Sequence, residues 1–591
     1  MKKVLNIKIV LILAFCSIIT GCKDDFLDED NPNAISTNTF WDDIHDLRLG
    51  IVGAYKGMAA PHNYHLVNEL SRSDLAWSSG WQRPNNNNEY YLQTFNEASS
   101  AINQKWGALY TTVFRANQVI EASERLAGTY GNDDLEEENS LILAQARFIR
   151  GYAYFNLHNS FNGGSVPIWD IVAGGDNGYY RPANTADEVR QFYLADLQYA
   201  SENLPTTWDD KEKGKVTAGA AVAVMGQSHL YAGNYAEAAV HFKRVIDEFG
   251  YSLTPNIGSN FTTLDELNEE SILELVYSID YKNELNPWDI RDTASTSGYD
   301  RQFTGAPGQW FGAVAANWLI LEYRNDPLDF SDPRNIVTEE DGTQRFRRFS
   351  LRTSWSVALV DDEDMEYYGF PKTGQAANFN VKMTCFWRKH TNWDLGFEKE
   401  ADITPGKVRS GINQRLIRLA EVYLQYAECM VQTGDVDEAL LYINKVRRRS
   451  GVRLLGPIGS GEYPLNDHDN EVYDANRLMD HLMYVEYPLE LSAEGDGGNR
   501  NIDLRRWGIK KQRFEELATK RYAADHYEVE KEDGTTAWRW ASIVKELDTS
   551  DPEVDLDWNE FQEAAINYNE ANHAYWPIPN SETIANPNLY N

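Results

Sequence analysis

Two polar segments of this chain combine aromatic and basic side chains in a way that suits ligand binding. Residues 74–91 are rich in Gly, Pro and Asn, which predicts a loop, and residues 286–311 are similarly irregular. Tryptophan and tyrosine rings stack on the apolar C–H faces of sugars, while polar groups fix the hydroxyls. The candidate ligand-binding residues are Trp77, Trp81, Arg83, Tyr90, Trp288, Tyr299, Arg301 and Trp310. We expect the two segments to meet on one face and hold a ligand; the alternative is that these rings anchor the loops to a core.

Side chains capable of covalent or acid–base chemistry show no recognisable arrangement. The acidic runs Asp361–Asp364 and Asp555–Asp557 lack the Gly and terminal Glu of a calcium-binding EF-hand, and we interpret them as solvated loops. There is no HExxH motif, phosphate loop or zinc-spaced Cys/His set. We therefore expect no catalysis, no cofactor and no metal ligands. Two carboxylates from distant parts of the chain could still form a glycosidase pair, so a helical glycan hydrolase or lyase stays an alternative.

The N-terminus predicts export and lipidation. A Lys-rich start precedes the apolar run Ile9–Ile19, which is too short to span a bilayer but fits the hydrophobic region of a signal peptide. The run ends in Ile-Thr-Gly-Cys, which resembles the bacterial lipobox. Residues 1–21 are therefore expected to be a signal peptide, Cys22 the lipidation site, and residues 22–38 a polar tether. Acyl chains on Cys22 would anchor the protein stably to a membrane.

Composition limits the partners. The chain has 90 acidic residues against 55 Lys and Arg, a net charge of -35. Such a surface repels nucleic acid and anionic lipid, so we expect no nucleic-acid binding and membrane attachment through the lipid alone. Apart from Cys22 and Cys16 of the signal peptide, the cysteines are Cys385 and Cys429. Cys429 lies in a helical apolar stripe and is expected to be a buried thiol; whether it pairs with Cys385 stays open.

Apolar periodicity predicts a largely helical chain. The expected helices cover residues 43–58, 104–126, 141–158, 186–204, 216–249, 412–434, 436–449 and 478–491. Two helix pairs, residues 220–246 and 418–446, look alike: in each, Gly ends one helix and Asn or Asp caps the next. This is the pattern of tetratricopeptide repeats. Because the copies lie about 200 residues apart, we expect an all-α, tetratricopeptide-like helix-pair scaffold with a long irregular insertion.

The domain organisation follows from this pattern. Residues 39–254 are expected to form an N-terminal helical region and residues 255–591 a C-terminal region. The latter comprises a loop-rich insertion carrying the ligand face (255–410), helix pairs (411–510) and a C-terminal segment (511–591). The aromatic content of the insertion argues against disorder.

Four stretches carry a family resemblance: Ala144–Leu157 with the following Phe161, Gly163-Gly164 and Val166-Pro167; Arg418–Arg447; Glu494–Gly508; and Trp576–Pro579. They resemble the SusD/RagB family of outer-membrane nutrient-binding lipoproteins of Bacteroidota. The resemblance covers essentially the whole mature chain in the same order. The sequence departs from the family where Tyr487-Pro488 follows Glu486 and where the turn before Arg500 is longer. We expect Pro488 to kink or end its helix.

The resemblance implies an all-α fold of four tetratricopeptide-like helix pairs, lipid-anchored on the cell surface at the outer membrane. It implies a lid over a SusC-like, TonB-dependent transporter and capture of oligosaccharides, or sometimes peptides, without cleavage. In the family, the segments matching 74–91 and 286–311 supply binding residues, and Lys23-Asp24-Asp25 resembles a surface-export tag. The expected partners are an oligosaccharide or polysaccharide, the transporter and the membrane. A peptide-binding or scaffolding repeat lipoprotein is the alternative.

Overall fold

The computed structural model of the chain describes residues 40–77, 87–172, 180–278, 297–303, 312–396, 410–495, 498–547, 555–556 and 560–590. About 49% of the chain is helical and the strands are short, so the expected all-α class is confirmed. Within the described ranges, no helix combines the length and the apolar character needed to cross a bilayer. The expected signal peptide, the lipidation site Cys22 and the tether lie outside these ranges.

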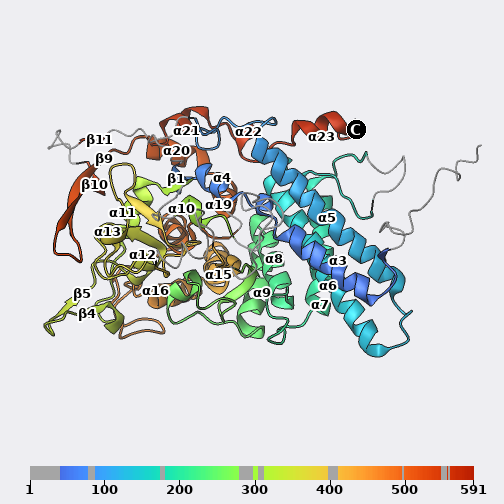
Figure 1. Cartoon of the computed structure of the whole chain (residues 1–591), viewed down its shortest axis with the longest axis horizontal. Coiled ribbons are helices and arrows are strands. Elements are labelled where there is room, and N and C mark those ends of the chain that lie inside the picture. The colour runs from blue at the N-terminus through green and yellow to red at the C-terminus, as the bar shows by residue number, and fades with distance from the viewer. Residues whose placement is uncertain are drawn as a thin grey trace, which may run out of the picture.

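Long helices make up one side of the molecule (Figure 1). They are α3 (Ile44–Met58), α5 (Ser100–Leu126), α6 (Asp133–Ser160), α7 (Ala186–Asn203), α8 (Ala218–Tyr231) and α9 (Tyr235–Glu248). Their starts follow from local capping: Asp43 forms a capping box with Asp46, and Thr185 forms one with Glu188. The side chain of Asn132 accepts hydrogen bonds from two backbone N–H groups at the start of α6. The helices expected here are confirmed.

The two similar helix pairs lie against one another. The second pair is α15 (Leu419–Thr433) and α16 (Val436–Arg449), and α15 packs on α9 of the first pair. Gly434, at φ 94°, ends α15, and the side chain of Asp435 caps α16. Gly226 of α8 lies so close to Phe242 of α9 that an added Cβ would meet the ring at 2.7 Å. The two helix pairs, which are distant in the sequence, therefore pack against each other through α9 and α15.

The opposite side of the molecule is built from short elements (Figure 1). The short helices there are α4 (Leu66–Ser71), α10 (Asp300–Phe303), α11 (Asn317–Asn325), α12 (Leu351–Ser356), α13 (Thr373–Ala376), α19 (Asn499–Arg506), α20 (Lys510–Ala518) and α21 (Gln562–Asn567). Two further short helices, α22 (Glu570–His573) and α23 (Asn580–Ala585), lie on the side of the long helices, near the start of α5 (Figure 1). Three antiparallel strand pairs join separate parts of the chain: β1 (Ala76–Trp77) with β3 (Val314–Ala315), β2 (Ser271–Leu275) with β8 (Gln414–Arg418), and β6 (Val357–Leu359) with β7 (Cys385–Trp387). A fourth pair, β4 (Ile336–Thr338) with β5 (Gln344–Phe346), is a local hairpin. The described part of the insertion is thus a set of short elements that non-local pairing helps to hold together.

The C-terminal region holds a hairpin that the sequence interpretation missed. Strand β9 (Tyr522–Glu530) lies between β10 (Thr536–Glu546) and β11 (Asp555–Leu556) in an antiparallel sheet. Figure 1 places this hairpin at the outer edge of the molecule, away from the long helices.

Two expectations about helices need correction. The start of the helix expected at residues 412–434 is the strand β8, because it pairs with β2. Of the two outcomes expected for Pro488, a kink or an end of its helix, the second is wrong. A π-helical turn, η6 (Leu482–Glu486), joins α17 (Ala475–His481) to α18 (Tyr487–Leu491), and Pro488 lies in the first turn of α18. Because a π-helical turn is wider than an α-helical one, η6 accommodates Pro488, which has no backbone N–H group to donate.

The buried apolar side chains of the described residues form two hydrophobic cores. The first joins the long helices to the second helix pair and to Trp576; the second joins the insertion to the C-terminal segment. Each core contains residues from the expected N-terminal region (39–254) and from the expected C-terminal region (255–591). A buried ion cluster lies where helix pair and insertion meet: Arg418 bonds Glu270 and Glu490 at 2.7 and 2.8 Å. Arg352 of α12 bonds Glu486 at 2.7 Å, so the cluster ties the insertion to the helices.

Candidate functional site

The described ends of the two aromatic segments lie side by side. Trp77, the last residue of β1, pairs with Val314, the first residue of β3, and Ala76 pairs with Ala315. Residues 78–86 follow β1 directly and residues 304–311 shortly precede β3; both lie outside the described residues. The pairing joins positions more than 200 residues apart in the sequence, and therefore brings together the points where the two predicted ligand-binding segments join the core.

The structure places three predicted site residues in or against the core. Trp77 is 0% exposed and Tyr90 is 6% exposed. Trp77 lies in a strand and not in a loop, and its burial favours the alternative that its ring anchors this segment to a core. Tyr299 is partly buried and packs against Phe303 and His390. Trp81, Arg83, Trp288, Trp310, the side chain of Arg301 and the lipidation site Cys22 lie outside what the structure describes. Ligand contact by the predicted set stays a prediction.

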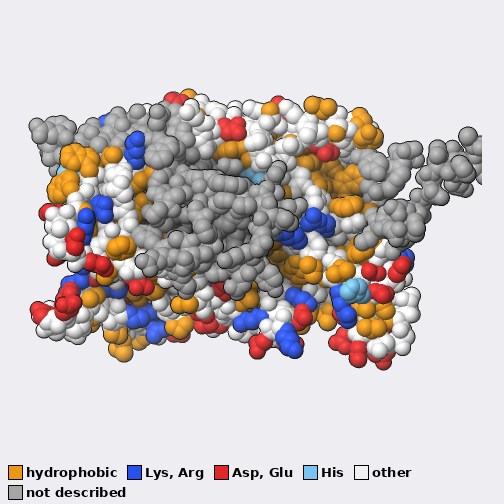
Figure 2. All heavy atoms as spheres, viewed as in Figure 1, with side chains coloured by type: hydrophobic (Ala, Val, Ile, Leu, Met, Phe, Trp, Pro, Cys, Tyr) orange, Lys and Arg blue, Asp and Glu red, His pale blue; other side chains and the backbone are white. Residues whose placement is uncertain are grey.

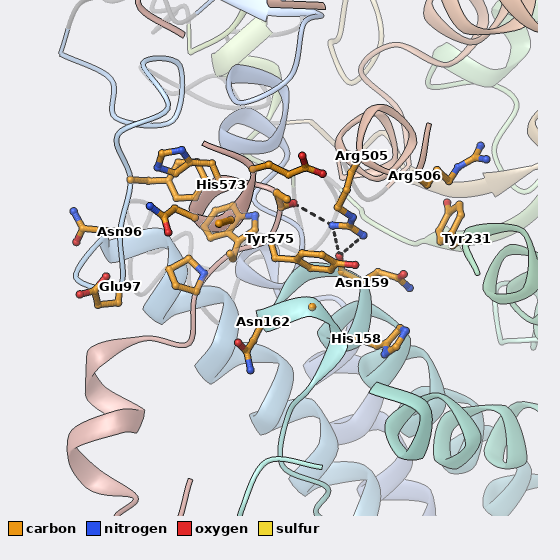
Figure 3. A pocket seen from close by; sticks show the side chains of 18 of the residues that line it. Asn96, Glu97, His158, Asn159, Asn162, Tyr231, Arg505, Arg506, His573 and Tyr575 are labelled. Carbon is orange, nitrogen blue, oxygen red and sulfur yellow. Dashed lines mark hydrogen bonds between the residues drawn. The ribbon is translucent and has the colours of Figure 1, made fainter. Parts of the chain in front are cut away.

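A cleft of about 1020 Å³ opens between the helical side and the C-terminal segment. Figure 3 shows its walls: the end of α6 with His158 and Asn159, the end of α19 with Arg505, and the segment that carries Tyr575. Trp576 lines the cleft, and the ring of Tyr90 stacks on it with centroids 5.6 Å apart. Tyr90 therefore supports a residue of the cleft wall. Polar groups and aromatic rings therefore face one solvent-filled space.

Arg505 occupies the centre of the cleft wall. Its guanidinium donates hydrogen bonds to the carbonyl oxygens of Asn159 and Ala574 at 3.1 and 3.2 Å, and it lies over the Tyr575 ring at 3.6 Å (Figure 3). A cation at the last carbonyls of α6 is favourable because that end of a helix is partially negative. Burial lowers the pKa of Arg505. Arg505 thus ties α6 to the C-terminal segment and fixes the orientation of Tyr575.

Two neutral histidines flank this arginine. Burial lowers the pKa of His158 and of His573 to about 4, so both rings are uncharged at neutral pH. Nδ1 of His573 accepts from the backbone N–H of Asn569 at 3.0 Å, which leaves the proton on Nε2. Arg506, the neighbouring cation, is neutralised by Glu428 and Asp503. The cleft wall therefore combines neutral histidines and aromatic rings with the charged residues Arg505, Glu97 and Glu570.

Sequence reasoning missed these cleft residues. In the sequence, Arg505 and Tyr575 lie within two residues of Trp507 and Trp576, which belong to stretches expected to pack in the core. No local pattern distinguishes a residue that lines a cleft from one that packs in the core. Only the packing of α19 against residues 574–575 brings them together.

The acidic run Asp361–Asp364 is not a solvated loop throughout. Asp361 and Asp362 are fully buried, and both carboxylate oxygens of Asp361 accept hydrogen bonds from Arg324, at 2.9 and 2.7 Å. Burial raises the pKa of Asp362. The side chains of Asp555–Asp557 lie outside the described residues. Cys385 and Cys429 are both buried free thiols, as expected for Cys429. Among the described residues, no group of three or more His, Cys, Asp or Glu is placed to hold a metal ion.

Comparison with known proteins identifies relatives along most of the chain. Residues 269–591 match the sequence model of a family described as "SusD family", and residues 25–230 match one described as "Starch-binding associating with outer membrane". A curated relative, SusD-like protein P25 of Formosa agariphila, is 24% identical over 526 residues, which cover 85% of this chain and 90% of the relative.

Solved structures share the fold at lower identity. A SusD superfamily protein from Bacteroides vulgatus has a TM-score of 0.65 at 20% identity, covering 93% of this chain and 99% of that one. A laminarin-binding SusD-like protein has a TM-score of 0.55 at 20% identity, with coverages of 80% and 93%. A structure solved with a xylogluco-oligosaccharide has a TM-score of 0.63 at 19% identity, with coverages of 92% and 97%.

Proposed function

This chain belongs to the SusD family, and from that premise we propose that it is a cell-surface lipoprotein that captures an oligosaccharide without cleaving it and delivers it to a SusC-like, TonB-dependent transporter of the outer membrane. Two of the structural neighbours support the ligand class: one is described as laminarin-binding and another was solved with a xylogluco-oligosaccharide. The lipobox ending in Cys22 supports the lipid anchor.

The pairing of Trp77 with Val314 is the observation that carries the proposal, because it joins two segments rich in Trp, Tyr and Arg at one place on the core. A sugar chain needs flat aromatic faces with hydrogen-bonding groups beside them, and loops supply both more readily than packed helices do. We assign ligand contact to Trp81 and Trp310 first, because Trp77 is buried in the structure.

Substitution of one ring from each segment tests the assignment. Trp81→Ala and Trp310→Ala should each weaken oligosaccharide binding at least tenfold, since loss of an aromatic anchor commonly costs about 2 kcal/mol and about 1.4 kcal/mol is a factor of ten. Melting temperatures should hardly change. Tyr575→Ala is the matched variant for the cleft: if it alone weakens binding, the ligand site is the cleft. If both loop variants bind normally but melt early, their rings are structural.

Delivery to a transporter is tested separately. A tagged chain, solubilised from outer membranes, should co-purify with a TonB-dependent transporter. The Cys22→Ala chain, expressed without that transporter, should leave the membrane fraction. A chain that binds sugar but never associates with a transporter would retain the glycan-binding part of the proposal and remove the delivery part.

A further inference from the structure

Two tryptophans on the C-terminal hairpin are exposed although the hairpin is already anchored by other residues. Trp538 and Trp540 of β10 are 57% and 60% exposed, whereas Val529, Ala541 and Val544 of the same hairpin are buried. Residues two apart on a strand point to the same face, so both rings share one surface. Figure 2 shows hydrophobic side chains at the edge of the molecule where Figure 1 places this hairpin. These rings are not required for the core.

A third ring holds the pair in place. His526 of β9 stacks on Trp540 with centroids 4.0 Å apart and planes at 29°, and lies 5.3 Å from Trp538. Its Nδ1 accepts a hydrogen bond of 2.8 Å from the backbone N–H of Ala541. Ala541 has φ 48° within an irregularity that shifts the β9–β10 register between Arg539 and Ile543. A non-glycine residue in this conformation is strained, and bulges commonly re-aim side chains near functional sites.

The charges around the rings favour a neutral ligand. The hairpin, residues 522–546, carries six carboxylates and three cations, and Glu528 lies directly opposite Trp538 in the strand register. This surface repels an anionic polysaccharide or an anionic membrane. A protein interface over the rings would bury the Glu528 carboxylate, which is costly unless the partner protein places a cation or hydrogen-bond donors against it. A sugar instead stacks its C–H face on the rings, and its hydroxyl groups donate hydrogen bonds to such carboxylates.

We propose that Trp538, Trp540 and His526 form a second binding platform, which takes a segment of a neutral polysaccharide. The inference rests on the proposed function, because it assumes that the chain binds glycan through the segments at 74–91 and 286–311. Figure 1 places the hairpin at the outer edge and β1 nearer the middle, so only a long ligand engages both. Two linked contacts raise the affinity for a long chain well above that of either site alone, by a factor of about 10² or more.

The test compares long and short ligands with a double variant. The ligand is whichever of starch, laminarin and xyloglucan the wild type binds. The double variant Trp538→Ala/Trp540→Ala should bind this polysaccharide at least tenfold more weakly than the wild type does. The affinity of the variant for the corresponding short oligosaccharide and its melting temperature should equal those of the wild type. The matched control is Phe330→Ala/Phe346→Ala. This pair is also exposed (50% and 44%) and its rings are also in contact, at 4.8 Å, but neither ring belongs to the β9–β10 hairpin; Phe346 is the last residue of β5. The control should bind polysaccharide as the wild type does.

Each result bears on one claim. Unchanged polysaccharide affinity in the tryptophan variant overturns the platform. An equal loss for short and long ligands also overturns it as a second site, because the hairpin would then belong to the primary site. Stronger wild-type binding to alginate than to any neutral polysaccharide overturns the ligand class. A wild-type chain that binds none of these glycans removes the proposed function and, with it, this inference.

Discussion

Replacement of Arg418 by methionine should destabilise the protein strongly without changing its shape. The Arg418 side chain is 1% exposed and bonds Glu270, Glu490 and Glu494 at 2.7, 2.8 and 2.5 Å. Arg418→Met retains most of the aliphatic volume but removes the charge. Glu270 and Glu490 would then share Arg449, and Glu494 would retain Lys389. Breaking a buried ion pair by removing one partner costs about 3–5 kcal/mol, so we expect a loss in that range at pH 7.

The pH dependence separates this electrostatic cause from a packing defect. Burial alone would raise the pKa of Glu270, but the charges of Arg449 and Arg418 outweigh it and hold the pKa at about 2. A carboxyl group with a lowered folded pKa stabilises the protein fully above its unfolded pKa of about 4.3, and the contribution is lost as the pH falls toward 2. In the variant the pKa of Glu270 rises and this contribution shrinks. The difference in unfolding free energy between wild type and variant should therefore be largest above pH 5 and smaller at pH 3.5.

Urea denaturation followed by tryptophan fluorescence measures both quantities. The control is Arg48→Met, which breaks an ion pair with Glu138 whose side chains are 52% and 33% exposed; it should cost less than about 1 kcal/mol. A loss below about 1 kcal/mol for Arg418→Met at pH 7, or a loss that grows as the pH falls, would refute the reasoning.

Three further predictions concern the anchor, the core and acid sensitivity. Cys22→Ala should yield an unlipidated chain; label from radioactive palmitate in that variant would contradict the lipobox interpretation. Trp507→Ala should lower the unfolding free energy by about 3 kcal/mol, because the ring packs edge-on against Tyr487 and its Nε1 donates to Glu428 at 2.9 Å; a melting temperature equal to that of the wild type would contradict this. Burial lowers the pKa of His390 to about 4, so the unfolded chain takes up the proton first and stability falls as the pH drops from about 6.5 to 4. His390→Gln, whose amide can still donate to the Ala493 carbonyl, should lose less stability over that range in urea titrations at each pH; an equal loss would rule out His390 as a source.

The helical scaffold could be predicted because its signals are local. The apolar positions between Asp43 and Met58 repeat with helical spacing, Gly233 and Gly434 follow their helices at positive φ, and Asp435 caps α16. The expected cap by Asn234 is wrong, because its side chain makes no cap hydrogen bond at the start of α9. The sequence predicts helix where the structure has strand β8, because the apolar residues Leu416 and Ile417 fit either period and only pairing with β2 decides between them. The buried position of Trp77 depends in the same way on β3, far along the chain.

The hairpin of β9 and β10 did have a sequence signal that the helical interpretation overlooked. Asp533-Gly534 is a turn pair, and it lies between the alternating residues Tyr527 and Val529 on one side and Trp538 and Trp540 on the other. The cleft residues had no such signal, because Arg505 and Tyr575 meet only through tertiary packing. Local periodicity therefore predicts the scaffold, whereas sites built from distant segments need the structure.

The most direct test of glycan capture is calorimetric titration of the purified mature chain with a panel of neutral polysaccharides, their oligosaccharides and oligopeptides, followed by analysis of the ligand for new reducing ends. We predict saturable binding to at least one glycan, no binding to peptides and no new reducing ends. Binding to peptides alone, or product release that a single carboxylate substitution abolishes, would contradict the account.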